Sequence, residues 1–233
     1  MTTKNLLIPL LVLIALPSAW AKGTADHGAP GVTPEQAYET LVAGNQRFVD
    51  GKATHPRQDV ARRAELAMGQ KPHTIVLSCS DSRVPPELVF DQGLGELFVV
   101  RVAGNVLGAA AVASMEYAVE HLGARLIVVM GHDSCGAVKA ALTTPKGKSA
   151  GSPDLDTLVA QIQPNLEKVK PEDDKTIRGP VRANVDGVTR QLTRKSEILR
   201  KAVESGKVKV VSAIYALASG KVEFWNNEGV SKR

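Results

Sequence analysis

Short apolar runs alternate with longer amphipathic stretches along most of this chain. The runs at 73–79, 97–102 and 125–131 are almost continuously apolar and rich in valine, isoleucine and leucine. A fourth run of this kind covers 208–216. Runs of this length and composition are typical of strands that are buried on both faces of a parallel sheet.

The stretches between these runs carry apolar residues at helical spacing. Thr33-Pro34-Glu35-Gln36 combines an N-cap, a proline at the first helical position and a capping-box partner, so it predicts a helix that reaches about Val49. Pro164 predicts a kink or a break inside one later helix. The other predicted helices cover about 60–69, 109–122, 136 to about 143, 154–169 and 180–205.

The order of these elements predicts the fold class. Strands that alternate with helices from 73 to 216 are typical of an α/β fold with a mostly parallel central sheet flanked by helices. The helices before residue 70 form an N-terminal helical arm in this prediction. Gly220 predicts a turn that brings 222–225 back as a C-terminal strand extension.

The first residues have the pattern of a secretory signal peptide. Lys4 precedes an apolar stretch from Leu6 to Pro17, and Ala19-Trp20-Ala21 fits a cleavage site. We therefore predict a signal peptide over 1–21, cut after Ala21, a flexible leader over 22–32 and a single domain over 33–228. The mature chain is expected to be periplasmic or secreted, with no membrane contact after signal removal.

The overall charge of the chain is mildly basic. It has 29 Lys and Arg against 24 Asp and Glu, and aromatic residues make up 4% of the sequence. Arginines are not interleaved with aromatic residues, so nucleic acid is excluded as an expected partner.

The two cysteines of the chain each follow an apolar run. Cys79 ends the run at 73–79, and His132 and Cys135 follow the run at 125–131. The carboxyl ends of parallel strands meet at one edge of the sheet, where α/β proteins bind their ligands. Two thiolates and an imidazole suit Zn²⁺ and leave its fourth position to water. A structural disulfide or a free buried cysteine is the alternative, and the neighbouring histidine, acid and base favour the metal site.

Asp81 and Arg83 lie two and four residues after Cys79. An arginine fork can hold a carboxylate, keep it ionised and aim it at a water beside the metal. If that contact breaks, Asp81 could itself bind the metal and close the fourth position. The alternative is an ordinary salt bridge in a turn.

These segments resemble the two motifs of β-class carbonic anhydrases. The motif residues are Cys-Ser-Asp-Ser-Arg-Val at 79–84 and Gly-His-Asp-Ser-Cys-Gly-Ala-Val at 131–138. The similarity covers about 33–225 and includes the segments 44–48, 98–105, 114–119 and 214–222.

The resemblance implies one Zn²⁺ per subunit, bound by Cys79, His132 and Cys135, with Asp81 and Arg83 as a catalytic dyad. It implies reversible hydration of carbon dioxide to bicarbonate and a proton by a zinc-bound hydroxide. It also implies a homodimer or a dimer of dimers whose sites are completed across the subunit interface. The expected substrate-binding residues are Gln70, Phe98, Ala103 and Tyr117.

Two other functions stay open at this point. An enzyme with the same ligands could hydrolyse a related small heterocumulene such as carbon disulfide. A non-catalytic protein could hold zinc or bicarbonate, although the Asp81–Arg83 pair favours catalysis. His73, just ahead of the first strand, is a candidate proton shuttle.

Overall fold

The computed structural model describes residues 31–169 and 176–226. The predicted signal peptide and most of the predicted leader lie outside these residues. Among the described helices, none combines the length and the apolarity that crossing a membrane requires.

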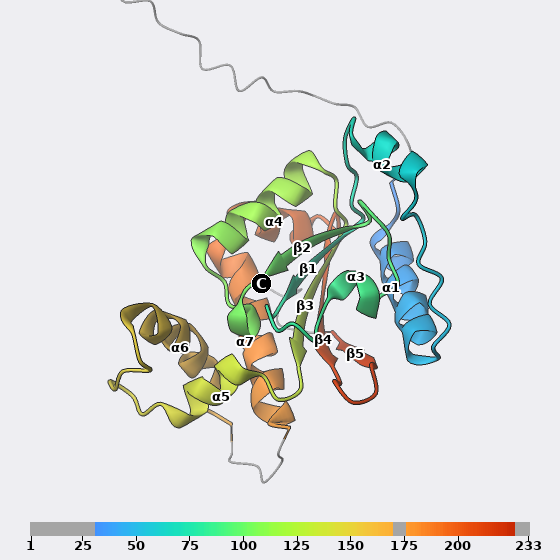
Figure 1. Ribbon diagram of the computed structural model, residues 1–233. Helices are drawn as coiled ribbons and strands as arrows, with labels where there is room; N and C mark the ends of the chain where they lie inside the picture. The colour runs from blue at the N-terminus through green and yellow to red at the C-terminus, as the bar shows by residue number, and fades with distance from the viewer. Residues whose placement is uncertain (1–30, 170–175, 227–233) are drawn as a thin grey trace, which may run out of the picture. The chain divides into compact units, whose positions relative to one another are not determined.

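The described residues form a five-stranded sheet of mostly parallel strands in the order β2-β1-β3-β4-β5 (Figure 1). β1, β2, β3 and β4 pair in parallel, and β5 is antiparallel to β4. The predicted fold class is therefore confirmed, including the C-terminal strand extension. The strands cover Thr74–Ser78 (β1), Leu97–Arg101 (β2), Leu126–His132 (β3), Lys209–Tyr215 (β4) and Val222–Trp225 (β5).

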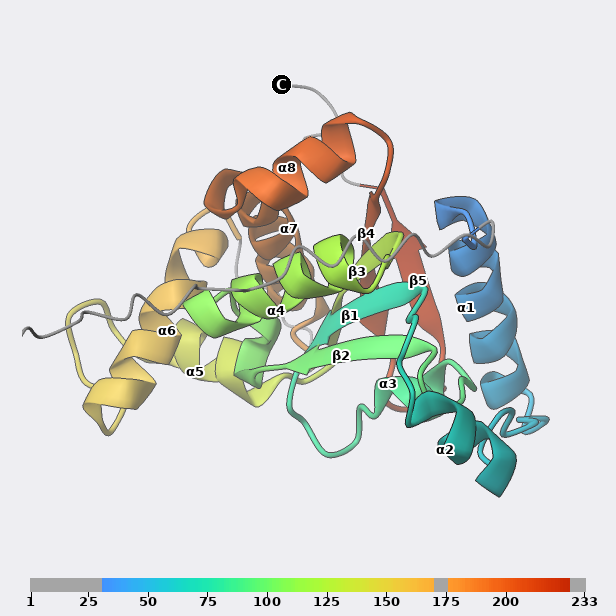
Figure 2. The same cartoon turned by 90° about the horizontal axis from the view of Figure 1, so that it is seen from above.

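Helices cover both faces of this sheet (Figure 2). Side chains of α4, α7 and α8 pack on one face, and those of α1 and α3 pack on the other. The pair α5 and α6 lies near the carboxyl ends of the parallel strands (Figure 1). The helices cover Pro34–Val49 (α1), Val60–Leu66 (α2), Pro86–Val89 (α3), Ala109–His121 (α4), Gly136–Thr143 (α5), Pro153–Leu166 (α6), Arg178–Lys195 (α7) and Glu197–Glu204 (α8), and a 3-10 turn covers Ala103–Asn105.

The prediction of one long helix over 180–205 is wrong. Ser196 has extended backbone angles between α7 and α8, and its side chain accepts the N–H of Leu199 as the N-cap of α8. The Ser196 hydroxyl also donates to Glu116 at 2.6 Å. This hydrogen bond connects the break between α7 and α8 to the neighbouring helix α4. A serine in an amphipathic stretch gives no pattern that separates a cap from an ordinary helical position.

Smaller differences concern the extent of two helices and the presence of a third. α2 ends at Leu66, short of the predicted end at about 69. α6 runs through Pro164 and ends at Leu166, short of the predicted end at 169. The short helix α3 begins after Pro85 and was not predicted, because four residues are too few to show a helical period.

A buried carboxylate ties the N-terminal helical arm to the rest of the domain. Asp91 is 3% exposed. Its oxygens accept hydrogen bonds from the backbone N–H groups of Thr54 and His55, from the Thr54 hydroxyl, and from Arg47 Nε at 2.6 Å. Burial raises the pKa of Asp91, but these donors outweigh burial and lower the pKa to about 2.

Asp91→Asn is expected to lower the free energy of unfolding by about 2 kcal/mol at neutral pH, because charge-assisted hydrogen bonds are stronger than neutral ones. The pKa of Asp91 is lower in the folded protein than in the unfolded chain. This contribution is therefore complete above about pH 4 and disappears as the pH falls to about 2. Urea unfolding of wild type and variant across this range measures it.

The matched control is Asp50→Asn, which neutralises an exposed carboxylate at the C-cap of α1. It is expected to change the free energy of unfolding by less than about 0.5 kcal/mol. A destabilisation by Asp91→Asn that is equal at every pH would contradict a role for the ionised group.

Candidate metal centre

Cys79, His132 and Cys135 converge at the carboxyl edge of the sheet. Cys79 directly follows β1, His132 ends β3, and Cys135 is the N-cap of α5. Because β1 and β3 are neighbours that pair in parallel, their ends meet. One potential ligand atom from each residue lies within 4.8 Å of the other two. All three residues are buried.

The two cysteines are free thiols. Their sulfur atoms are 4.0 Å apart, about twice the length of a disulfide bond. The alternative of a structural disulfide is therefore not realised in this structure. A distance of this size leaves room for an ion between the two sulfurs.

The orientation of the His132 ring fits a metal ligand. Nδ1 lies 2.9 Å from the carbonyl oxygen of Asp133, which can only accept, so Nδ1 carries the proton and donates it. Nε2 therefore presents its lone pair to the cysteines. Nε2 is buried and has no hydrogen-bond partner among the described residues. A buried acceptor without a partner, oriented by a carbonyl on its other nitrogen, is the arrangement that metal-binding histidines use.

Electrostatics favour one thiolate in this cluster even without an ion. The Cys135 thiol donates to Cys79 and lowers the pKa of Cys79. The pKa of Cys135 is raised because the same proton would have to leave from beside a thiolate, and because the group is buried. Two thiolates and an imidazole are a donor set that fits Zn²⁺. An ion bound here would replace the shared proton, so the affinity of the site for the ion would fall at acidic pH.

Asp81 and Arg83 form the predicted pair. Arg83 Nε and Nη2 donate to Asp81 Oδ1 and Oδ2 at 2.9 and 2.8 Å, and the Arg83 backbone N–H donates at 3.0 Å. The hydrogen bonds from Arg83 hold the pKa of Asp81 well below its usual range. Asp81 Oδ2 lies 3.8 Å from His132 Nε2, so the carboxylate faces the space that the three ligand atoms share. With Arg83 holding it, Asp81 is not in the predicted closed arrangement.

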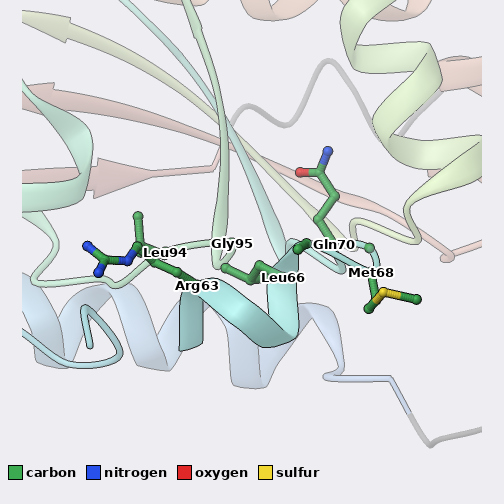
Figure 3. A pocket seen from close by; sticks show the side chains of 8 residues that line it. Arg63, Leu66, Met68, Gln70, Leu94 and Gly95 are labelled. Atoms are coloured by element: carbon green, nitrogen blue, oxygen red, sulfur yellow. The ribbon is translucent and has the colours of Figure 1, made fainter. Parts of the chain in front are cut away.

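Gln70 lies away from this cluster. It precedes β1, whereas Cys79 follows it, and a strand of five residues is about 16 Å long. Gln70 lines an open pocket of about 630 Å³ together with Arg63, Leu66, Met68 and Leu94. Figure 3 shows the side chains of Gln70 and Met68 pointing in opposite directions. Within one chain, Gln70 therefore cannot contact a substrate beside Cys79.

The three residues of the predicted apolar pocket occupy different places. Ala103 begins the 3-10 turn next to Cys79 and is half-buried. Phe98 lies in β2 opposite Ile75 and packs on the core. Tyr117 is 48% exposed on α4 and contacts the ring of His121. Of the three, Ala103 is the residue that the structure places beside the cluster.

His73 does not reach the cluster either. Its Nδ1 lies 2.7 Å from the hydroxyl of Thr74, the first residue of β1. The ring is thus at the amino end of the strand, opposite the end that carries Cys79. A direct proton shuttle by His73 within one chain is not supported by this geometry.

Comparison with known proteins identifies the family. Residues 74–222 match the family described as carbonic anhydrase. A carbonic anhydrase from Mycolicibacterium smegmatis is 38% identical over 200 residues, which are 86% of this chain and 97% of the relative. Carbonic anhydrase 2 from Mycobacterium tuberculosis is 38% identical over 82% of this chain and 93% of the relative.

Solved structures specify the class within the family. The β-carbonic anhydrase CcaA is similar with a TM-score of 0.66 and 26% identity over 81% of this chain and 95% of that chain. A Coccomyxa β-carbonic anhydrase, solved in complex with acetazolamide, is similar with a TM-score of 0.64 and 26% identity over 78% and 83%. This chain belongs to the β-class carbonic anhydrase family. The resemblance inferred from the two cysteine segments is thereby confirmed.

Arg101 is a residue of this carbonic anhydrase site that the sequence analysis did not single out. Its guanidinium donates to the backbone carbonyls of Cys79 and Asp81, so it fixes the loop that carries the first cysteine and the carboxylate. Arg101 belongs to the segment 98–105, which the resemblance already included. Its role was not visible from the sequence because both of its acceptors are backbone atoms of another segment.

Proposed function

We propose that this chain is a zinc enzyme that catalyses the reversible hydration of carbon dioxide to bicarbonate and a proton. The observation that carries the proposal is the buried Cys79–His132–Cys135 cluster with the ionised carboxylate of Asp81 facing it. Family membership supports the same activity. A cluster that only stored metal would have no need of a carboxylate oriented by an arginine.

The donor set decides what an ion would do here. Zn²⁺ held by these three residues would act as a Lewis acid that makes a nucleophile from water near neutral pH. Two thiolates cancel the charge of the ion, so this effect is weaker than at a site built from three histidines. The remaining catalytic demand falls on the protein groups around the cluster.

Asp81 and Arg83 meet part of that demand. Asp81 is held as an anion, so it can accept a hydrogen bond from the attacking water and align the oxygen lone pair toward carbon dioxide. Arg83 holds both carboxylate oxygens, so Asp81 presents one fixed orientation. Ala103 supplies a small apolar surface beside the cluster, which suits a small apolar substrate.

A stopped-flow assay of carbon dioxide hydration tests the proposal. The zinc-loaded protein is expected to accelerate the reaction, to lose this activity with a chelator and to regain it when Zn²⁺ is restored. The chelated protein is the matched control, because it contains every side chain. Protein that carries one zinc per chain yet leaves the reaction at its uncatalysed rate would rule out the activity.

We also propose that the active form is a homodimer or a dimer of dimers, and that Gln70 acts in the site of a second copy. Gln70 is exposed, and so is Met68, two residues before it in the same surface segment. β2 is an edge strand with half-buried side chains, as an interface strand would be. A protein that is monomeric by light scattering and fully active in the hydration assay would contradict this proposal.

We further propose that residues 1–21 are a signal peptide and that the mature enzyme is periplasmic or secreted, on the basis of the apolar stretch and cleavage pattern in the sequence. Intact-mass analysis of the exported protein is expected to show a chain that begins at Lys22. A cytosolic protein that retains its first residues would contradict it.

A further inference from the structure

Three buried or half-buried amide side chains form a continuous path from the outer helices to the carbonyl oxygen of Gly104, the residue whose N–H contacts Cys79 Sγ. Gln191 Nε2 donates to Asn165 Oδ1 at 3.2 Å, and Asn165 Nδ2 donates to Asn184 Oδ1 at 2.9 Å. Asn184 Nδ2 then donates to the carbonyl oxygen of Gly104 at 2.9 Å. We call Gln191, Asn165 and Asn184 the amide chain. It links α7 and α6 to the 3-10 turn at the edge of the metal centre.

The direction of the amide chain is set by its last acceptor. A carbonyl oxygen can only accept, so Asn184 must turn its NH₂ group toward Gly104. The Asn184 oxygen then faces Asn165, which must donate, and the Asn165 oxygen faces Gln191. Each amide therefore has one arrangement, and a change at one member is felt by the next.

Gly104 passes this constraint to the sulfur of Cys79. Its backbone N–H donates to Cys79 Sγ at 3.4 Å. Its φ of 63° lies in the left-handed region, and a Cβ there would be 2.7 Å from Ile162 Cδ1. The turn is thus tightly packed on one side and held by Asn184 through its carbonyl on the other.

The surrounding helices are shaped around the amide chain. Gly187 of α7 has no Cβ, and a Cβ there would lie 2.1 Å from Asn165 Oδ1. Asn184 is 0% exposed, and burying an amide costs free energy unless its hydrogen bonds are all formed. An apolar side chain at 184 would fill the same space, but it would leave the buried carbonyl of Gly104 without this donor. Packing alone therefore does not account for this amide.

We propose that Asn184, oriented by Asn165, is a positioning residue that holds Gly104 so that its N–H stays on the Cys79 sulfur. A hydrogen bond to a thiolate withdraws electron density from it and weakens its donation to a metal. In a site whose two thiolates cancel the charge of the ion, this restores part of the ion's electron-withdrawing power. The inference rests on the proposed metal centre and deepens it.

Cobalt substitution tests the inference through a spectroscopic signal. The probe is Co²⁺ alone, bound to wild type, Asn184→Leu and Thr189→Val. Thr189 lies on the same helix, is equally buried and hydrogen-bonds Ser212, so its variant removes a buried hydrogen bond that does not lead to Cys79. We expect the sulfur-to-cobalt charge-transfer band to move to longer wavelength in Asn184→Leu and to stay in place in Thr189→Val.

The zinc-loaded variants give a second readout. Asn184→Leu is expected to lower kcat about tenfold with KM for carbon dioxide unchanged, and Thr189→Val is expected to leave both constants near wild type. If Asn184→Leu does not fold, Asn165→Asp replaces it. A carboxylate at 165 can only accept, so it turns the Asn184 amide round and removes its hydrogen bond to Gly104 while the shape is kept. The same band shift is expected.

The outcomes separate this inference from the metal centre itself. A band at the wild-type wavelength in the amide-chain variants, or an equal shift in Thr189→Val, overturns the role of Asn184 and leaves the metal centre intact. If wild type gives no sulfur-to-cobalt band, the metal centre is wrong and the inference fails with it.

Discussion

Cys79→Ser is expected to remove bound zinc and to lower the rate of carbon dioxide hydration by at least about 1,000-fold. A serine hydroxyl is not deprotonated at neutral pH, so the variant keeps two of the three ligands and loses the thiolate that this structure favours most. A catalytic zinc site has only three protein ligands, so the loss of one of them removes a large part of its affinity for the ion. Zinc content by mass spectrometry and stopped-flow hydration measure the two losses on one preparation.

Ser78→Ala is the matched control for this variant. Ser78 is the last residue of β1, directly before Cys79, and it is equally buried. Its hydroxyl has no hydrogen-bond partner among the described residues, so its removal is expected to leave zinc content, activity and stability near wild type. A Cys79→Ser protein that still holds one zinc per chain with high affinity would contradict the ligand assignment.

Asp81→Asn is expected to lower kcat by about 100-fold to 1,000-fold while zinc content stays at the wild-type level. The asparagine has the size of the native side chain, but it is uncharged and can keep only one of the two side-chain hydrogen bonds from Arg83. The loss therefore reports the charge and the acceptor that face the cluster. Steady-state kinetics and zinc analysis of the same sample separate this loss from a loss of metal.

The pH dependence of this variant gives a further check. Arg83 holds the pKa of Asp81 well below its usual range, so the native carboxylate stays ionised from about pH 6 to about pH 9. The ratio of wild-type to variant kcat is expected to be constant over this range.

Asp133→Asn is the control for Asp81→Asn, because Asp133 follows His132 directly but its carboxylate pairs with Arg178. It is expected to keep most of the activity. Equal losses in the two variants would remove the special role given to Asp81.

The strands and their order of appearance were predictable because burial on both faces leaves a continuous apolar run for each parallel strand. The bounds of β1, β2 and β3 differ from the predicted ones by at most one residue at either end. The break at Ser196 was not predictable, because it depends on a hydrogen bond to Glu116, a residue of another helix. Local pattern contains no information about such a partner.

The candidate site likewise contains residues whose place was predictable from the sequence and one whose place was not. Cys79 and the His132–Cys135 segment were recognised because each follows an apolar run, and the carboxyl ends of parallel strands must meet at one edge of the sheet. Topology then brings them together whatever the details of packing. Gln70 follows no such rule. A place beside the substrate would require the amino end of β1, which Gln70 precedes, to lie near Cys79. Within one chain, Cys79 lies at the opposite end of this strand.

The sequence by itself predicted the family, the proposed metal ligands and the carboxylate–arginine pair, because these lie in two short segments whose spacing along the chain is part of the pattern. The tertiary structure alone decided which way these groups face. The orientation of the His132 ring depends on the carbonyl of the neighbouring residue Asp133. The hydrogen bonds of Arg101 to the backbone of Cys79 and Asp81, and the path from Gln191 to the carbonyl oxygen of Gly104, join backbone carbonyls and helices far apart in sequence. Backbone acceptors are the same at every position of a sequence, so only folding shows which of them a side chain meets.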